Sequence, residues 1–274
     1  MKQQGKAAYY QELMKIARGG WKPQDYSQHL LIPDNRIMVL ADVHLPRHDE
    51  KFLAQAFEHA YNVGIESIVF LGDLMDNPTW SKWGVEDWSD NYERELTICQ
   101  AIVRCAADAV PHVYWSYGNH EARVLRDLKA QIKMRHLALL CELQDLMDQG
   151  RLIVSDDPTL EAFGGTWMLT HPSAYGPQPL VKPGLIATRF EKHIISAHAH
   201  HYASGLDQTG RFQVIESGGL FKPEYFKYIQ HRVTPHRAWV QGYWILDDGM
   251  PTGYRPTTSV MKRTGKTLLE RLSA

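Results

Sequence analysis

Residues 36–44, R-I-M-V-L-A-D-V-H, join a short apolar run to two polar side chains, Asp42 and His44. Residues 67–73, S-I-V-F-L-G-D, repeat the pattern, and residues 112–121, H-V-Y-W-S-Y-G-N-H-E, repeat it again. Nearly continuous apolar runs with β-branched residues are typical of strands buried on both faces. We therefore predict three buried strands, each followed directly by polar residues.

Helix-like stretches at residues 49–63 and 92–109 separate these strands, and the alternation predicts an α/β sheet with crossover helices. From Glu121 onward, apolar residues at three-, four- and seven-residue steps predict one amphipathic helix that ends at Gly150. The pattern of the remaining sequence predicts mainly strands. They are expected at residues 152–155, 166–170, 193–197, 212–216 and 238–245.

The chain has 274 residues, and neither an internal repeat nor a low-complexity linker divides it. At roughly 150 residues per domain, this length fits one large or two small domains, and we prefer one domain with loops. We place that domain at residues 36–250, with insertions at about 77–91 and 172–183. Residues 1–35 are then an N-terminal arm and residues 251–274 a basic C-terminal tail.

Thirty basic and thirty-one acidic residues leave a net charge of -1, so no overall field attracts nucleic acid or an anionic membrane. The three cysteines include no C-x-x-C pair, which argues against a disulfide framework and a cysteine metal site and favours a reducing compartment. No signal peptide or membrane span is evident. We expect a cytoplasmic protein with no membrane partner, which could form an oligomer.

Polar side chains follow five of the predicted strands, at the end where α/β sheets place their ligand sites. They are Asp42, His44, Asp73, Asp76, Asn119, His120, His171, His198 and His200. Alternate residues of an extended segment project to one side, so Asp42 with His44, and His198 with His200, could each grip one centre. His201 should then point away and have a structural role.

Seven of these groups form a mixed nitrogen and oxygen ligand set, which suits Mn, Fe, Zn or Ni better than Ca or Mg. They exceed what one tetrahedral ion can use. Two divalent ions that share a bridging carboxylate would use all seven and could clamp both oxygens of a phosphoryl displacement. The residues therefore predict a centre with two transition-metal ions, Mn²⁺ first among the candidates.

The ordered motifs D-x-H, G-D-x-x-D, G-N-H-E, a single histidine and H-x-H lie between residues 42 and 200. In this order the sequence closely resembles the calcineurin-like metallophosphoesterase superfamily. The resemblance implies an α/β/β/α fold, in which two mixed β-sheets pack as a sandwich flanked by helices. The usual glycine before H-x-H is Ala197 here, which adds one methyl group to the turn.

By the same resemblance, Asp42, His44 and His200 would bind the first metal, and Asn119, His171 and His198 the second. Asp73 would bridge the two. His120 corresponds to the catalytic histidine that approaches the leaving-group oxygen, and Asp76 to the carboxylate that orients it. An imidazole suits that task because its ordinary pKa of about 6.5 lies near working pH.

The resemblance implies hydrolysis of a phosphate ester by attack of a metal-bound hydroxide. Asn77-Pro78 and Tyr117-Gly118 stand where phosphoprotein phosphatases have phosphate-binding Arg-Gly pairs, which argues against that branch. We expect a phosphodiester of a nucleotide or of a short nucleic-acid end. A phosphomonoesterase or a pyrophosphohydrolase would use the same motifs, and a catalytically silent scaffold protein is a remote alternative.

Four residues are candidates for substrate binding. Arg123 could meet a phosphate or form an ordinary salt bridge on its helix. Trp80 and Trp83 could stack a nucleobase of a nucleotide or a single strand, or could instead pack the insertion onto the domain or form a subunit contact. Tyr175 lies between two ligand segments and could therefore lie near the site, although a solvated loop is the preferred interpretation.

Overall fold

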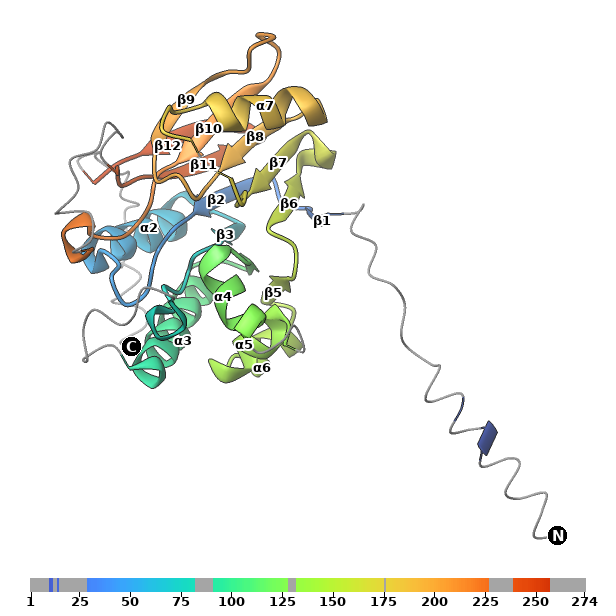
Figure 1. Ribbon diagram of the computed structural model, residues 1–274, viewed down its shortest axis with the longest axis vertical. Coiled ribbons are helices and arrows are strands. Elements are labelled where there is room, and N and C mark those ends of the chain that lie inside the picture. Colours follow the sequence, from blue (N-terminus) through green and yellow to red (C-terminus); the bar gives the residue numbers. More distant parts are fainter. Residues whose placement is uncertain are drawn as a thin grey trace.

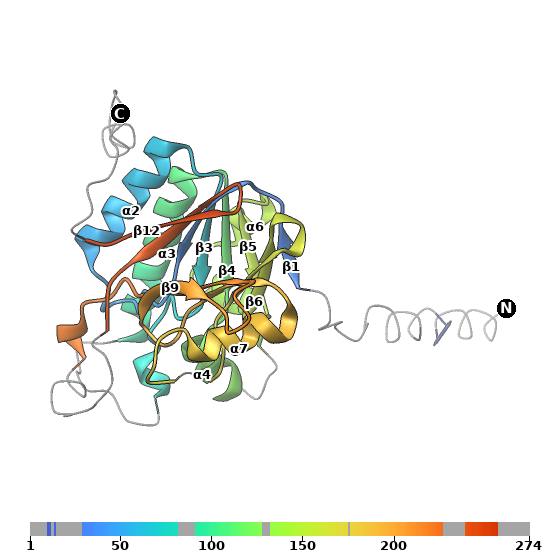
Figure 2. The same cartoon turned by 90° about the horizontal axis from the view of Figure 1, so that it is seen from above.

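The computed structural model describes residues 10–11, 14, 29–81, 91–127, 132–174, 176–226 and 239–256. Two six-stranded mixed sheets lie face to face with helices on their outer sides, which confirms the predicted α/β/β/α sandwich (Figures 1 and 2). The strands are β1 (Leu30–Ile32), β2 (Arg36–Leu40), β3 (Ser67–Leu71), β4 (His112–Ser116), β5 (Leu152–Ser155), β6 (Thr159–Ala162), β7 (Trp167–Thr170), β8 (His193–Ser196), β9 (Tyr202–Leu206), β10 (Gln213–Ser217), β11 (Tyr243–Asp247) and β12 (Met250–Tyr254).

The helices cover both outer faces of this sandwich, and three short 3-10 turns join its elements. The helices are α2 (Glu50–Val63), α3 (Tyr92–Ala109), α4 (Asn119–Asp127), α5 (Met134–Leu140), α6 (Gln144–Asp148) and α7 (Val181–Phe190). The turns are η1 (Pro78–Trp80), η2 (Phe163–Gly165) and η3 (Pro223–Tyr225). Within the described ranges, no helix is long and apolar enough to cross a lipid bilayer.

The first sheet has the strand order β12-β11-β2-β3-β4-β5. Its four strands from β2 to β5 are parallel, and β11 joins β2 antiparallel and pairs with β12. The second sheet has the order β1-β6-β7-β8-β10-β9, with β7, β8 and β10 parallel. Parallel neighbours bring their carboxyl ends to the same edge, so the loops after β2, β3 and β4 are neighbours, as are those after β7 and β8.

Three apolar clusters separate the four layers. Met38 and Leu40 of β2 pack with α2 and α3, whereas Ile37 and Val39 face the second sheet. This division follows from the alternation of side chains along a strand. On the far side of the second sheet, a smaller cluster includes Ala187 of α7. Apolar burial on both faces of β2 explains why its sequence is a continuous apolar run.

Helix α2 shows how local sequence sets the helix limits. The Asp49 side chain accepts hydrogen bonds from the backbone N–H groups of Lys51 and Phe52, which caps the amino end. Gly64 ends the helix in the left-handed region, with φ of 73°. The prediction of a helix over residues 49–63 therefore agrees with the structure to within one residue.

The single helix predicted from Glu121 to Gly150 is wrong, because the chain forms α4, α5 and α6 there. Glu142 has φ of 54°, and the Leu143 N–H donates to the Ala138 carbonyl at 3.1 Å, so the chain turns between α5 and α6. Leu143 nevertheless packs in the same core as Leu137. Apolar residues of this segment do pack in one core, but a turn interrupts the helix between them.

Other limits also differ from the prediction. Residues 30–32 pair with β6 and residues 250–254 pair with β11, so the paired strands extend beyond the expected domain of residues 36–250. The proline- and glycine-rich segment 172–183 runs into α7, which begins at Val181. The strand expected at 238–245 is β11 at Tyr243–Asp247. Most of the tail, from residue 257, lies outside the described residues.

His59 on α2 is buried against β11 and β12 of the first sheet. Its Nδ1 atom lies 2.8 Å from the Tyr243 hydroxyl, and its ring contacts Tyr254 edge to face at 4.5 Å between centroids. Burial lowers the pKa of His59 below its ordinary value. Below about pH 6.5 the unfolded chain therefore binds a proton at this histidine more readily than the folded chain.

We expect the free energy of unfolding of metal-free protein to fall as pH drops from 6.5 to 5, by at most about 1.4 kcal/mol per pH unit from this one group. Urea unfolding in EDTA at several pH values measures the slope. His59→Gln should give a shallower slope, while His136→Gln, at an exposed histidine, should keep the wild-type slope. Equal slopes for all three proteins would contradict the assignment.

Candidate metal centre

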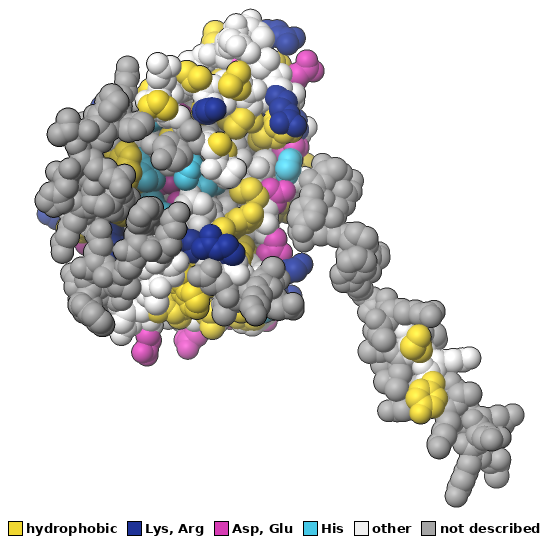
Figure 3. Space-filling view, in the orientation of Figure 1, with side chains coloured by type: hydrophobic (Ala, Val, Ile, Leu, Met, Phe, Trp, Pro, Cys, Tyr) yellow, Lys and Arg dark blue, Asp and Glu magenta, His cyan; other side chains and the backbone are white. Residues whose placement is uncertain are grey.

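The polar ends of β2, β3, β4, β7 and β8 meet at one edge of the sandwich. Figure 3 shows histidine side chains gathered on the face that Figure 1 presents. The structure brings all seven predicted ligands to this place, in two adjoining groups described below. Residues more than 150 positions apart in the sequence, such as Asp42 and His200, are neighbours there.

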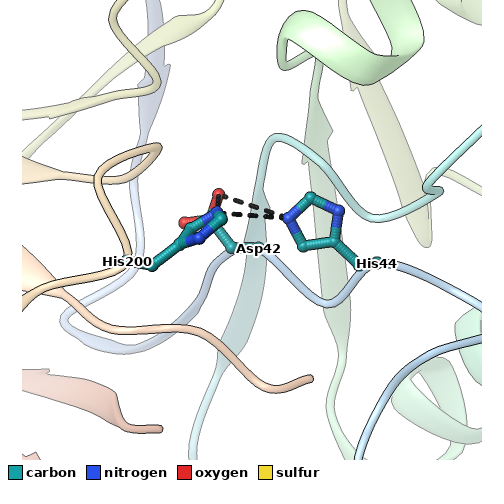
Figure 4. A group of neighbouring side chains, drawn as sticks. All are labelled: Asp42, His44 and His200. Carbon is teal, nitrogen blue, oxygen red and sulfur yellow. Dashed lines mark hydrogen bonds and ion pairs between the residues drawn. The ribbon is translucent and has the colours of Figure 1, made fainter. Parts of the chain in front are cut away.

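The first group consists of Asp42, His44 and His200 (Figure 4). Nε2 of His200 lies 3.2 Å from Oδ1 of Asp42 and 3.2 Å from Nε2 of His44. The other carboxylate oxygen of Asp42 accepts the backbone N–H of His198 at 3.0 Å. One oxygen of Asp42 is thus held by the backbone, while the other is turned toward two imidazole nitrogens.

The second group consists of Asp73, His171 and His198, with Asn119 beside them. Nε2 of His171 lies 3.5 Å from Oδ2 of Asp73 and 3.1 Å from Oδ1 of Asn119. Oδ2 of Asp73 also lies 4.0 Å from Nε2 of His44, a member of the first group. Asp73 therefore lies between the two groups, as a bridging ligand must.

The backbone brings these ligands together in a way that the extended-strand argument did not anticipate. Asp42, His44, Asp73, His198 and His200 all have positive φ values, between 50° and 77°. They lie in left-handed turns after the strands rather than in extended segments. The prediction that His198 and His200 grip one centre is therefore wrong, because His198 joins the group of Asp73 and His200 joins that of Asp42.

Hydrogen bonds at Nδ1 turn two imidazoles so that Nε2 faces the centre. Nδ1 of His44 lies 3.0 Å from Oδ1 of Asp76, and Nδ1 of His171 lies 3.2 Å from the Leu71 carbonyl oxygen. Since a carbonyl can only accept, Nδ1 of His171 carries the proton and Nε2 has a free lone pair. Such outer contacts are typical of histidines that bind metals.

His120 lies beside the two groups of candidate metal ligands, and three contacts fix its position. Its backbone N–H donates to Oδ1 of Asp73 at 2.8 Å, and its Nδ1 lies 2.7 Å from the Asp76 carbonyl oxygen and 3.0 Å from Oδ1 of Asp76. Nε2 therefore points toward Oδ2 of Asp73, at 3.7 Å. Burial opposes a charge on this imidazole, yet the carboxylates of Asp73 and Asp76 raise the pKa of His120 to about 9.

Two arginines contact Asp76 from different sides. Arg47 donates from Nη1 to Oδ2 of Asp76, and its guanidinium lies over the Phe226 ring at 5.6 Å. Arg123 donates from Nη1 to the Asp76 carbonyl at 3.3 Å, and its Nη2 lies 2.8 Å from Nε2 of His120. Arg123, a candidate from the sequence, thus lies at the site, whereas Arg47 was not anticipated.

Asn77 follows Asp76 in a left-handed turn with φ of 49°. Its Nδ2 donates to the His120 carbonyl at 3.3 Å, and its backbone N–H donates to Oε1 of Glu95 at 2.7 Å. Burial raises the pKa of the Glu95 carboxyl to about 8. Instead of the arginine of phosphoprotein phosphatases, this position holds a side chain that ties the Asp76 loop to His120.

Glu121 organises the loops beneath the centre, a role that we did not assign from the sequence. Its buried carboxylate accepts backbone N–H groups from Asp73 at 3.0 Å, Met75 at 3.0 Å and Gly118 at 2.9 Å. Its position in the G-N-H-E motif was the feature of the sequence that could have identified this role.

The glycine of the G-D-x-x-D motif also has a physical reason, since a Cβ on Gly72 would lie 2.5 Å from Nδ1 of His171.

An aromatic wall borders the first group and was also missed. Phe221 contacts the rings of His44 and His200 at 5.2 and 4.7 Å, and Trp239 contacts His200 at 4.3 Å. Phe226 completes the wall, 5.5 Å from His44. These residues follow the last recognised motif, so no pattern in the sequence pointed to them.

The aromatic candidates for substrate binding have a different outcome. Trp80 of η1 packs edge to face on Tyr92 of α3, with 6.0 Å between ring centroids. This contact fits the alternative in which Trp80 packs the insertion onto the domain. Trp83 and Tyr175 lie outside the described residues. His201 is buried, with Nδ1 3.3 Å from Oε2 of Glu216, as a structural role requires.

The donor set fits divalent metal ions. Oδ1 of Asp42 is buried and accepts no hydrogen bond from the described residues, although it lies among the ligand atoms of the first group. Within each group, the candidate ligand atoms lie within 4.8 Å of one another. A buried carboxylate oxygen of this kind calls for a cation. Mixed imidazole, carboxylate and amide donors are suited to transition metals.

The protonation states also suit metal binding, which needs ionised carboxylates and neutral imidazoles. Burial acts to raise the pKa of Asp42 and of Asp73, but neighbouring histidines outweigh it and lower both values. Burial, aided by His171, lowers the pKa of His198 to about 4. At neutral pH, therefore, Asp42 and Asp73 are ionised and His198 is neutral.

Comparison with solved structures finds proteins of low sequence identity. Vps29 of Chaetomium thermophilum is 11% identical, with a TM-score of 0.39 and coverage of 77% of this chain and 84% of that chain. Wild-type Vps29 of Entamoeba histolytica in complex with Zn²⁺ is 11% identical, with a TM-score of 0.38 and coverage of 80% and 97%. A dimetal phosphatase from Danio rerio is 11% identical, with a TM-score of 0.39 and coverage of 82% and 99%.

A comparison with curated proteins found no match. The family model of the calcineurin-like phosphoesterases matches residues 35–219, a range that begins just before β2 and contains every motif residue from Asp42 to His200. Because this match covers more than half of the 274 residues, the chain belongs to the calcineurin-like phosphoesterase family.

Proposed function

We propose that this protein is a two-metal phosphodiesterase that cleaves a phosphodiester of a nucleotide or of a short nucleic-acid end. The observation that carries the proposal is the setting of His120. Its Nδ1 is bound by Asp76, and its Nε2 lies 3.7 Å from Asp73, the carboxylate between the two ligand groups. A proton donor is thereby fixed beside the place where a phosphate would lie.

Of two divalent ions, one would be held by Asp42, His44 and His200 and the other by Asn119, His171 and His198, and Asp73 would serve both. When bound, such ions polarise the phosphate and make water a stronger nucleophile. Mn²⁺ is the preferred candidate for these donors, with Fe, Zn or Ni as alternatives. The protein itself supplies orientation, through the Nδ1 contacts of His44 and His171.

The chain's own residues also supply the proton. His120 would give the Nε2 proton to the departing alkoxide, and Asp76 would stabilise the charged imidazole until then. Because Nη2 of Arg123 lies 2.8 Å from this nitrogen and can only donate, Arg123 would turn away from it when Nε2 carries the proton. A diester needs this donor because an alkoxide is a poor leaving group. The presence of Asn77 in place of an arginine supports a diester over a phosphoprotein. Phe221 and Phe226 are buried, so among these three rings it is the half-buried Trp239, 4.3 Å from the His200 ring, that supports a substrate with a flat organic group.

Metal dependence is the first test. EDTA should abolish hydrolysis of bis-p-nitrophenyl phosphate, and Mn²⁺ should restore it, with about two ions per chain by elemental analysis at saturation. An active, saturated protein that holds one ion would contradict the paired site. Full metal loading without hydrolysis of any ester would instead favour the scaffold alternative.

His120→Ala should retain both ions but lose on the order of 10²–10⁴-fold in kcat on thymidylyl-thymidine, because the alkoxide then departs unprotonated. Asp73→Asn should lower metal occupancy itself, since it weakens the shared ligand. Elemental analysis and turnover, measured together, separate the two effects. His136→Ala, at an exposed histidine, is the control. Wild-type kcat in His120→Ala would refute the role of His120 as the acid.

A substrate panel tests the preference for diesters. The panel consists of bis-p-nitrophenyl phosphate, p-nitrophenyl phosphate, a cyclic nucleotide, a dinucleoside polyphosphate and single-stranded DNA, each with Mn²⁺. We expect the bis-ester to be cleaved faster than the monoester, because only the bis-ester has a second aryl group that the half-buried Trp239 ring beside His200 can contact. Much faster cleavage of p-nitrophenyl phosphate would make the protein a monoesterase, and selective cleavage of the polyphosphate would make it a pyrophosphohydrolase.

A further inference from the structure

We infer that Glu95 of α3 is a positioning residue for the proposed reaction, because it holds the loop of Asp76 and Asn77 in the place where Asp76 contacts His120. The inference rests on the proposed function and deepens it, since it concerns the same site. Glu95 belongs to none of the clusters of candidate metal ligands in the described part of the chain, and its side chain is buried against Asn77. It therefore acts through other residues and does not touch the substrate.

Two hydrogen bonds in series connect Glu95 to His120. Oε1 of Glu95 accepts the backbone N–H of Asn77 at 2.7 Å, and Nδ2 of Asn77 donates to the His120 carbonyl oxygen at 3.3 Å. The residue before Asn77 is Asp76, whose carbonyl oxygen and Oδ1 atom lie 2.7 and 3.0 Å from Nδ1 of His120. A shift of Asn77 therefore moves the two oxygens that contact the His120 ring.

The backbone of this loop depends on contacts from outside it. Asn77 has φ of 49°, in the left-handed region, which a residue other than glycine keeps when the surrounding structure holds it there. On one side, the Asp76 N–H donates to the Leu45 carbonyl at 3.0 Å, and on the other, the Asn77 carbonyl accepts the Trp80 N–H at 3.1 Å. Glu95 holds the N–H between these two contacts, and so fixes the point where the loop turns into η1.

Packing alone does not explain a glutamate at this place. The Glu95 side chain is 2% exposed, and its Oε2 atom is buried with no hydrogen-bond partner among the described residues. Burial raises the pKa of Glu95 to about 8, and the carboxylates of Asp76 and Glu121 act in the same direction. A buried carboxyl with an unpaired oxygen destabilises a core, whereas an apolar side chain would not. The contact with Asn77 is what an apolar side chain could not provide.

Three variants of Glu95 separate the hydrogen bond from the space that the side chain fills. Because the carboxyl is mainly neutral at pH 7, glutamine is its close match, with the same length and a carbonyl oxygen that can accept the Asn77 N–H. Methionine has a similar length and volume, but its thioether is only a weak acceptor. Alanine removes both the acceptor and the volume.

Turnover of thymidylyl-thymidine with Mn²⁺ is the first measurement. Glu95→Met and Glu95→Ala should each lower kcat about tenfold, the effect of losing one hydrogen bond that orients the site, with KM and metal content unchanged. Glu95→Gln should restore most of kcat, and Glu93→Ala, at an exposed position of the same helix, is the control. Wild-type kcat in folded Glu95→Met or Glu95→Ala would overturn the inference, as would an equal loss in Glu95→Gln.

A double-mutant cycle with His120 tests the route by which Glu95 acts. In His120→Ala protein the imidazole is absent, so the further change Glu95→Met should lower kcat by less than about twofold. Residues that act independently give losses that multiply in the double variant. Such multiplied losses would mean that Glu95 supports the structure in general, and they would overturn the positioning role.

Crystal structures give a readout that does not depend on turnover. In Glu95→Met, the contact between Nδ2 of Asn77 and the His120 carbonyl should be lost, whereas in Glu95→Gln it should remain. An unchanged Asp76–Asn77 loop in Glu95→Met would overturn the inference.

Failure of the proposed function can be told apart from failure of this inference. If the proposed function fails, wild-type protein leaves both bis-p-nitrophenyl phosphate and thymidylyl-thymidine intact, or His120→Ala keeps the wild-type kcat, and the role of Glu95 falls with it. Turnover that depends on His120 but not on Glu95 would overturn the positioning role alone.

Discussion

The buried carboxylate of Glu121 holds three backbone N–H groups, and the geometry of the centre depends on this contact. It joins the loop after β3 to the loop after β4, and so fixes Asp73 between the two ligand groups. Asp73 in turn accepts the backbone N–H of His120, which positions the imidazole that we propose as the proton donor. Such a carboxylate, with no exposure to water, is maintained only because its oxygens are satisfied by several donors.

The sequence was informative where polar residues followed strongly apolar strands. The runs before Asp42, Asp73 and Asn119 are buried on both faces, so their pattern identified parallel strands, and parallel strands put their ends side by side. That chain of reasoning placed the candidate ligands at one edge without any knowledge of distances. The family resemblance then divided them into two sets. In the structure, Asp42, His44 and His200 form one group and Asp73, His171 and His198 another, while His44, Asp73 and His120 form a third group that overlaps both.

The sequence was less informative where long-range contacts override local pattern. Periodicity could not reveal the turn at Glu142, because Leu143 packs in the same core as the helix before it. It could not reveal Arg47 either, whose partner Asp76 lies on another loop. The assumption of extended strands failed for His198 and His200 for a related reason: backbone dihedrals after a strand are set by the surrounding loops, not by the strand.

The left-handed backbone of five candidate ligand residues has a consequence for the balance between stability and activity. An aspartate or histidine in that region costs of order 1 kcal/mol relative to glycine, which adopts it freely. Glycine at Asp42 or His198 would relax the fold but would remove a ligand. The folded protein therefore holds its ligands at some cost to its own stability, a cost set by the sheets and the Glu121 network before any ion arrives. A more thermostable relative designed without regard to chemistry would lose these residues first.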